Sequence, residues 1–501
     1  MRSKKALYNS MASMLLQVVS LICGFILPRM ILSSFGSSYN GITSSISQFL
    51  AVVTLLRAGI GGATRASLYK SLAVNDNDQI SSTIKATEIF MRKISLIFVA
   101  GVLIFAICYP FFVKEFDWLF SSSLVVIISL STFIQYYFGI TYQMLLQADQ
   151  KSYVYSLLQI ITTILNTLLA ALLIKCNVGI HGVKLGSSVV FCITPVFLNI
   201  YVKKTYNLNP TSKPDFSSIK QRWDAFFHQV VSFIHSNTDI MILTFFSNMK
   251  EISVYTVYYL VANGLKHIIL TISSGIEAAF GNMLAKGEKI LLSKNLRLYE
   301  TSMHILVTII FSSALVLITP FIKIYTSGIT DVNYERYLFG YLVLIGEMFY
   351  CCKNPYESIV NAAGHFKQTK KYAVWESLIN IIFSLILVYK YGLIGVVTGT
   401  VLSIIFRTFI YAYYIGNIVG VKFIKTIKRF LVTFLNSGIL VTLSSLFSLN
   451  NITLYKEWII YAIIITLLSI LTTIIINFIF YKNDILELYH KLKNTLTKKC
   501  G

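Results

Sequence analysis

Long apolar runs separated by short polar segments fill this sequence from end to end. The runs are roughly 20 residues long, the length that an α-helix needs to cross the hydrocarbon core of a bilayer. About fourteen can be counted, with centres near residues 20, 53, 100, 135, 163, 191, 235, 265, 312, 348, 378, 404, 438 and 468. The pattern predicts an all-α polytopic membrane protein with about fourteen transmembrane helices.

Two glycine-containing stretches indicate an internal repeat. GIHGVKLGS occupies 179–187 and GLIGVVTGT occupies 392–400, an offset of 213 residues. A weaker match at an offset of 212 relates 60–73 to 272–285. Because the offset spans six helices, an even number, both halves have the same orientation in the membrane. We therefore expect two pseudo-symmetric six-helix bundles with two extra helices, the architecture of a secondary transporter.

The repeat also predicts how the chain is divided. We expect an N-terminal bundle, a cytoplasmic linker, a C-terminal bundle, helices 13 and 14, and a tail, which are residues 1–203, 204–222, 223–419, 420–481 and 482–501. The tail has its apolar residues on one face and lysines elsewhere, which predicts an amphipathic helix on the cytoplasmic surface of the membrane. The apolar face consists of Ile485, Leu488, Tyr489, Leu492 and Leu496.

The distribution of charge predicts the orientation of the helices. The net charge is +22, although only 13% of the residues are charged, against about a quarter in globular proteins. Lysine and arginine gather in alternate polar segments, beginning with the N-terminal one, and the loops between these segments hold one or two each. By the positive-inside rule, both termini are cytoplasmic. Because membrane orientation accounts for the basic residues, we expect no nucleic-acid partner.

Two basic residues near the middle of apolar runs are the main candidates for binding. Inserting a central arginine costs about 2.5–3.5 kcal/mol, so such a residue usually faces a partner or a hydrated cavity. Arg57 lies near the middle of helix 2, and Lys266 lies near the middle of helix 8, the equivalent helix of the second half. Together they predict a cationic cavity between the bundles, which suits an anionic cargo.

Four further cations lie within or beside the apolar runs. Arg29, near the outer end of helix 1, either lines the mouth of the cavity or reaches the membrane interface. Arg407, in the middle of helix 12, either lines the cavity or packs elsewhere. Arg65 and Lys353 lie nearer to helix ends, where we expect both to reach the interface.

Three glycines follow Arg57 in helix 2: Gly59, Gly61 and Gly62. They allow close helix contact, and they also make a helix easier to bend. The sequence leaves both interpretations open, close packing alone or flexibility in the helix that carries the charge of the cavity.

Acidic residues inside the apolar runs either neutralise a neighbouring cation or couple transport to an ion gradient. They are Asp239, Glu277, Glu347, Glu357 and Glu376. Coupling to a proton or sodium gradient needs at least one such acid, and the candidates are Asp239, Glu277 and Glu347. We expect no catalytic residue, metal or cofactor, because the seven cysteines lack metal-ligand spacing and no nucleotide-binding loop occurs.

Several blocks resemble the Wzx-type polysaccharide flippases of the multidrug/oligosaccharidyl-lipid/polysaccharide (MOP) exporter superfamily. The blocks are NGITSSIS (40–47), GIGGATRASLYKSLA (59–73), LLQADQKSYV (145–154) and NAAGHFKQTKKY (361–372). The resemblance covers about the first 420 residues and implies a fold of two six-helix bundles. It also implies a function, namely moving undecaprenyl-pyrophosphate-linked oligosaccharide from the inner to the outer leaflet of the bacterial cytoplasmic membrane. The implied partners are this cargo, membrane lipids, and the glycosyltransferases and polymerase of a pathway such as O-antigen or capsule synthesis.

The resemblance also implies which cations bind the cargo. The related lipid II flippases use arginines of helices 1, 2 and 8, and Arg29, Arg57 and Lys266 occupy similar places here. Lysine at the third place supplies a point charge in place of a bidentate fork. Many relatives have an acid where Arg57 stands, so we expect no ion coupling through that residue.

Two other functions are compatible with many transmembrane helices. A MATE-like, ion-coupled drug exporter would bind organic cations, which Arg57 and Lys266 would repel. A membrane polysaccharide polymerase or ligase would need an extended outer loop with catalytic groups, whereas the longest polar linker, 204–222, is predicted to be inside. Both are therefore less favoured than a flippase that works by alternating access.

Overall fold

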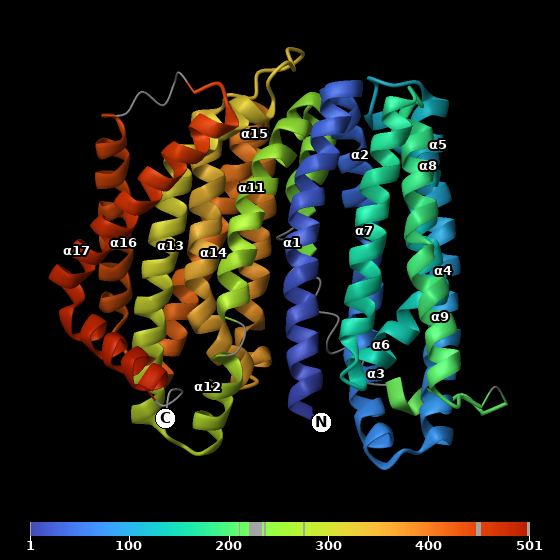
Figure 1. The fold of residues 1–501 in the computed structure, drawn as a ribbon, viewed down its shortest axis with the longest axis horizontal. Coiled ribbons are helices and arrows are strands. Elements are labelled where there is room, and N and C mark those ends of the chain that lie inside the picture. Colours follow the sequence, from blue (N-terminus) through green and yellow to red (C-terminus); the bar gives the residue numbers. More distant parts are fainter. Residues whose placement is uncertain are drawn as a thin grey trace. The chain divides into compact units, whose positions relative to one another are not determined.

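The computed structural model describes residues 2–209, 211–219, 233–234, 237–273, 276–446 and 452–497. These residues form helices joined by short turns and loops, and none of them belongs to a strand (Figure 1). Nine helical stretches of this part of the chain are long and apolar enough to cross a membrane. One of these stretches contains two helices joined at Gly392. The prediction of an all-α membrane fold is confirmed.

The first compact unit comprises Met1–Val254 and Gly328–Val332. Its helices are α1 (Arg2–Phe35), α2 (Ser37–Leu50), α3 (Val53–Val74), α4 (Asn77–Phe112), α5 (Trp118–Ile134), the π-helix η1 (Gln135–Gly139), α6 (Ile140–Ala148), α7 (Ser152–Lys175), α8 (Ile180–Phe191), α9 (Ile193–Thr205) and the short η2 (Phe216–Ile219). Residues 237–246 are also helical. Helix α5 packs against α4 and α8, and α7 packs against α1 and α8 (Figure 1).

The second compact unit comprises Tyr255–Ser327 and Asn333–Gly501. Its helices are α11 (Met249–Ser273), which begins in the first unit, α12 (Ile276–Ala285), α13 (Lys289–Tyr325), α14 (Tyr337–Ala362), α15 (Phe366–Val419), α16 (Phe423–Ser444) and α17 (Tyr455–Thr497). Helix α13 contacts α14, α16 and α17, and α14 also packs against α15 (Figure 1). The last two helices are thus anchored on α13.

The expected linker is only partly described. Residues 210 and 220–222 lie outside the described residues, and residues 211–219 include η2, which packs against α3 and α4. The chain passes from the first compact unit to the second within α11, after Val254. The domain boundaries derived from the repeat stay a prediction. In the tail, α17 has one non-helical residue, Tyr481, after which it continues as a helix.

Polar side chains are buried in these helices, and apolar side chains cover their outer surfaces. In the second unit, Ser312 bonds Ser437 at 2.7 Å, and Asn436 Nδ2 donates to Thr473 at 2.6 Å. Large apolar side chains along α17 are instead exposed, including Leu467 at 60%. Such exposure is unfavourable in water and favourable in lipid. The distribution of side chains therefore agrees with a multi-pass membrane protein.

Both copies of the repeated glycine motif lie where one helix turns into the next. Gly179 immediately precedes α8, and Gly392 joins the two halves of α15 with φ +52°, a conformation that favours glycine. The last glycine of each motif is a point of close approach. A Cβ on Gly186 would lie 2.7 Å from Leu173, and a Cβ on Gly399 would lie 2.3 Å from Ser384 Oγ. The motif therefore marks a tight helical hairpin.

We expect Gly399→Val to destabilise the second unit. Its Cβ would also lie 2.6 Å from the backbone nitrogen of Ser384, so the two halves of α15 would have to separate. Overpacking of this kind costs about 1–3 kcal/mol. The melting temperature of the purified protein in detergent measures the loss. Gly438→Val in α16 is the matched control, since a Cβ there has no neighbour within 4 Å. Equal melting temperatures for the two variants would contradict the prediction.

Candidate functional site

The second unit contains a group of buried ion pairs centred on α14. One face of this helix carries Glu347, Tyr350, Lys353 and Glu357, because residues three or four apart lie on the same side of a helix. Cations and acids from α11 and α15 complete the group. We call these residues the ion-pair group, and they are Lys266, Glu347, Tyr350, Lys353, Glu357, Glu376, Arg407 and Tyr411.

Lys266 projects from α11 toward Glu347. Its Nζ lies 3.0 Å from Glu347 Oε1, and the side chains of the pair are only 11% and 6% exposed. The ammonium also lies 4.9 Å from the ring centroid of Tyr350 and 5.5 Å from that of Tyr259. Both rings offer their electron-rich faces to the cation. The positive charge expected at Lys266 is therefore present, but a carboxylate neutralises it.

Lys353 is buried, so the expectation that it reaches the membrane interface is wrong. Its Nζ lies 3.1 Å from Glu357 Oε2, one helical turn away, and the lysine side chain is 5% exposed. It also lies 4.4 Å from the ring centroid of Tyr350, which therefore contacts two ammonium groups. A lysine can reach the interface only where its stem runs along an exposed surface, and α14 is packed against α13 and α15 here.

Arg407 pairs with Glu376 across the two halves of α15. Its Nη1 lies 3.1 Å from Glu376 Oε2, and both side chains are buried. Its Nη2 donates to the hydroxyl of Tyr411, whose ring centroid lies 4.1 Å from the guanidinium carbon. Lys353 also interacts electrostatically with Glu376, which connects this pair to α14.

The ion-pair group is electrically balanced, with three cations and three carboxylates. Such pairing makes buried charge tolerable, because an unpaired ion in a low-dielectric interior is strongly destabilising. Three polar atoms of the group are buried without a hydrogen bond to the described part of the chain: Glu347 Oε2, Arg407 Nε and Arg407 Nη1, the last of which makes only the ion pair with Glu376. The group can therefore accept a water, an ion or a ligand without breaking a hydrogen bond at any of these atoms.

In the first unit, the predicted residues lie on α1 and α3. The backbones of Arg57 and Gly59 are helical within α3, but both lie outside the residues whose side chains are described. Arg29 is half-buried on α1. Arg65 Nη1 donates to Gln147 Oε1 of α6 at 2.9 Å, so the side chain binds a neighbouring helix. Its expected position at the interface is untested.

The glycines of α3 are helical. The expected second helix is interrupted at residues 51–52, between α2 and α3, and not at Gly61 or Gly62. Gly61 is buried, and a Cβ there would lie 3.5 Å from Arg65 Nη1 and from Met144 Cε. A Cβ on Gly62 would meet no atom of another part of the chain within 4 Å. A Cβ at Gly61 would therefore make ordinary van der Waals contacts, so close packing does not require glycine at either position, and the flexibility of this helix stays a prediction.

The two remaining acids differ in their surroundings. Asp239 is 4% exposed, in the helical segment 237–246. Glu277 is exposed on α12, where Asn361 Nδ2 donates to it at 3.5 Å. A role in ion coupling stays a prediction for both, as it does for Glu347.

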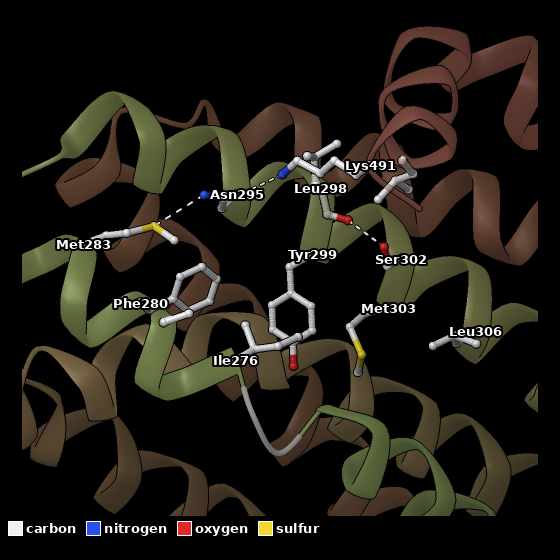
Figure 2. Close-up of a pocket in the computed structure, with 12 residues that line it drawn as sticks. Ile276, Phe280, Met283, Asn295, Leu298, Tyr299, Ser302, Met303, Leu306 and Lys491 are labelled. Carbon is white, nitrogen blue, oxygen red and sulfur yellow. Dashed lines mark hydrogen bonds between the residues drawn. The ribbon is translucent and has the colours of Figure 1, made fainter. Parts of the chain in front are cut away.

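A separate cavity of about 270 Å³ lies between α12, α13 and the tail of α17 (Figure 2). Its walls are mostly apolar, with the rings of Phe280 and Tyr299 5.9 Å apart. At its edge, Lys491 Nζ donates to Asn295 Oδ1 at 2.8 Å. A lining of this kind suits an apolar chain and not an anion.

Sequence reasoning identified six of the eight members as cations or acids within or beside the apolar runs, but not the two tyrosines or the burial of Lys353. Tyr350 and Tyr411 carry no charge and follow no motif. The spacing of Glu347, Tyr350 and Lys353 was the one available signal, since it places an aromatic ring between an acid and a base on one helix face.

Comparison with known proteins gives a consistent result for the fold. No profile of a known protein family and no curated protein sequence matches the chain. Among solved structures, the lipid II flippase MurJ in an inward closed conformation is similar with a TM-score of 0.70 and 19% identity, covering 95% of this chain and 99% of that one. An inward-facing MATE-family multidrug resistance transporter is similar with a TM-score of 0.60 and 11% identity, over 80% and 94%. A MOP-superfamily transporter from Pyrococcus furiosus is similar with a TM-score of 0.58 and 12% identity, covering 82% of this chain and 96% of that one. The chain has the fold of the MOP-superfamily transporters.

Proposed function

We propose that the protein is a flippase that moves an undecaprenyl-pyrophosphate-linked oligosaccharide from the inner to the outer leaflet of a bacterial cytoplasmic membrane by alternating access. The observation that carries the proposal is the similarity to a lipid II flippase over nearly the full length of both chains. The sequence blocks that resemble Wzx-type flippases support it independently. Both termini are cytoplasmic in this proposal, in agreement with the distribution of lysine and arginine.

Arg57 and Lys266 are the proposed ligands of the pyrophosphate, with Arg29 and Arg407 as further cations on its route. Because Lys266 pairs with Glu347 at 3.0 Å, the phosphate has to compete with this carboxylate. A phosphate that captures the ammonium leaves the carboxylate of Glu347 beside a second negative charge, which makes Glu347 the proposed site of coupling to a proton or sodium gradient. The prenyl chain stays in the surrounding lipid.

The pathway partners follow from the cargo. Glycosyltransferases must build the oligosaccharide before it crosses the membrane, and a polymerase or a ligase must consume it afterwards. The proposal therefore includes these enzymes as neighbours of the protein in the membrane, and no cofactor.

Transport by proteoliposomes tests the proposal. Vesicles containing the protein and a fluorescent prenyl-pyrophosphate oligosaccharide should move this lipid between leaflets, as measured by its accessibility to an added quencher. Arg57→Ala should slow the movement about 10- to 100-fold, the effect of losing one hydrogen bond to a charged group. Arg65→Ala, which removes the same charge from the same helix, is the control and should retain movement. Efflux of a cationic dye without lipid movement would overturn the proposal in favour of a drug exporter.

A further inference from the structure

A second cavity, distinct from the ion-pair group, lies at the N-terminal ends of α13 and α16. It measures about 510 Å³ and is lined by α13, the turn after α15, the start of α16, and the tail of α17. Five cations and two carboxylates line it: Lys289, Lys294, Arg297, Lys425, Arg429, Glu300 and Glu487. We call it the basic pocket, and all of its walls belong to the second unit.

Ion pairs with the tail neutralise one side of the basic pocket. Arg429 bonds Glu300 and also lies 3.3 Å from Asp484 Oδ2. Arg297 forms ion pairs with Asp484 and Glu487 at 3.1 and 3.0 Å, and Lys294 lies 2.7 Å from Glu487. These three cations face three carboxylates. The paired side forms a fixed wall that holds the tail against α13.

The other side of the basic pocket carries surplus positive charge. Lys289 and Lys425 are exposed, and neither makes an ion pair within the described part of the chain. Lys289 is the first residue of α13, and Lys425 lies in the first turn of α16. The N-terminal end of a helix carries partial positive charge and unpaired N–H groups, so two helix ends add to the two ammonium groups. Together they favour an anion such as phosphate.

Apolar neighbours of these lysines indicate the source of the phosphate. Ile290, which follows Lys289, is 88% exposed, and Ile424, which precedes Lys425, is 64% exposed. An exposed isoleucine beside an exposed lysine is the arrangement of a membrane interface, where the apolar group enters the acyl region and the ammonium meets head groups. A soluble phosphate ligand would not need either isoleucine.

We infer that the basic pocket binds the phosphate of an anionic phospholipid, with Lys289 and Lys425 as its ligands. The positive-inside pattern places this end of α13 at the cytoplasmic leaflet, where anionic head groups attract basic residues. The bound head group lies beside the tail, so lipid composition controls how firmly α17 is held. The site is separate from the proposed transport residues and does not depend on the cargo.

Native mass spectrometry of the full-length protein, titrated with dioleoyl phosphatidylglycerol, tests the inference. Each lysine near an anionic surface strengthens binding about fivefold, so K289A/K425A should bind the first lipid about thirtyfold more weakly. K203A/K204A at the end of α9 removes the same charge from exposed positions and should bind as the unmodified protein does. Dioleoyl phosphatidylcholine should bind weakly to all three.

Three outcomes decide the question. Loss of phosphatidylglycerol in K289A/K425A alone supports the site. Equal binding by all three proteins, or equal loss in K203A/K204A, overturns it in favour of non-specific attraction. A third arm uses glycerol phosphate without acyl chains, and saturable binding that K289A/K425A loses would overturn the assignment to a lipid. Because both lysines are exposed, the variants should fold normally, and an unchanged melting temperature without lipid verifies this.

Discussion

Lys266→Ala should strongly destabilise the second unit and stop lipid movement. The replacement leaves the carboxylate of Glu347, which is 6% exposed, without the ammonium that lies 3.0 Å away. Removing one partner of a buried ion pair costs about 3–5 kcal/mol, because the remaining charge is uncompensated. We expect a clear fall in the melting temperature of the purified protein in detergent. Lipid movement in proteoliposomes should be lost as well.

The double variant K266A/E347A separates the two effects. Replacing both members of a buried pair often has little effect on stability, since no charge is left unpaired. We therefore expect its melting temperature to return close to that of the unmodified protein. If Lys266 binds the cargo phosphate, lipid movement stays absent in the double variant. Recovery of both stability and movement would contradict the substrate role of Lys266 and make the pair purely structural.

The fold could be predicted from the sequence because the membrane imposes simple rules. A spanning helix needs an apolar run of fixed length, so the pattern locates most helices without any knowledge of packing. The repeated glycine motif was also informative, because Gly179 and Gly392 lie at equivalent turns between two helices. The break between α2 and α3 at residues 51–52 was missed, since no proline or glycine marks it.

The partners within the site could not be predicted. Lys266, Glu347 and Arg407 were each identified as charges in an apolar run, but which acid meets which base depends on how α11, α14 and α15 pack. The predicted position of Lys353 at the membrane interface was wrong because it was based on the closeness of the residue to a helix end. The sequence does not show which side chains surround it. A lysine near a helix end reaches the interface only if no carboxylate lies closer to it. For Lys353 the carboxylate of Glu357 lies closer, at 3.1 Å.

The tail shows a related limit. Its apolar face could be identified from periodicity, but Asp484 and Glu487 are the residues that pair with α13. Arg429 belongs to one of the lysine- and arginine-rich segments that the positive-inside rule places in the cytoplasm, whereas its side chain is only 5% exposed inside the second unit. Two acids three residues apart on a lysine-rich tail were the available signal. As long as the position of Arg429 is unknown, these two acids look like ordinary charges on a solvated helix face.

Arg429→Leu should release the tail from α13 and have the largest effect of these variants. The guanidinium pairs with both Glu300 and Asp484, and it also donates to the backbone oxygen of Arg297 at 3.1 Å. Its removal leaves two buried carboxylates short of a partner, so we expect a loss at or above the about 3–5 kcal/mol of a single broken pair. Amide hydrogen exchange over residues 482–491 should rise before the rest of the second unit opens.

Arg407→Leu is the matched control for this prediction. It removes an equally buried arginine from one carboxylate, Glu376, and its described contacts lie on α15, away from the tail. The melting temperature of this variant should also fall, but hydrogen exchange over 482–491 should stay as slow as in the unmodified protein. If both variants accelerate exchange in the tail equally, the tail is held by the general stability of the second unit and not by Arg429. If neither does, Lys294 and Arg297 are sufficient to hold Glu487, and the pairing of Arg429 with Asp484 contributes little.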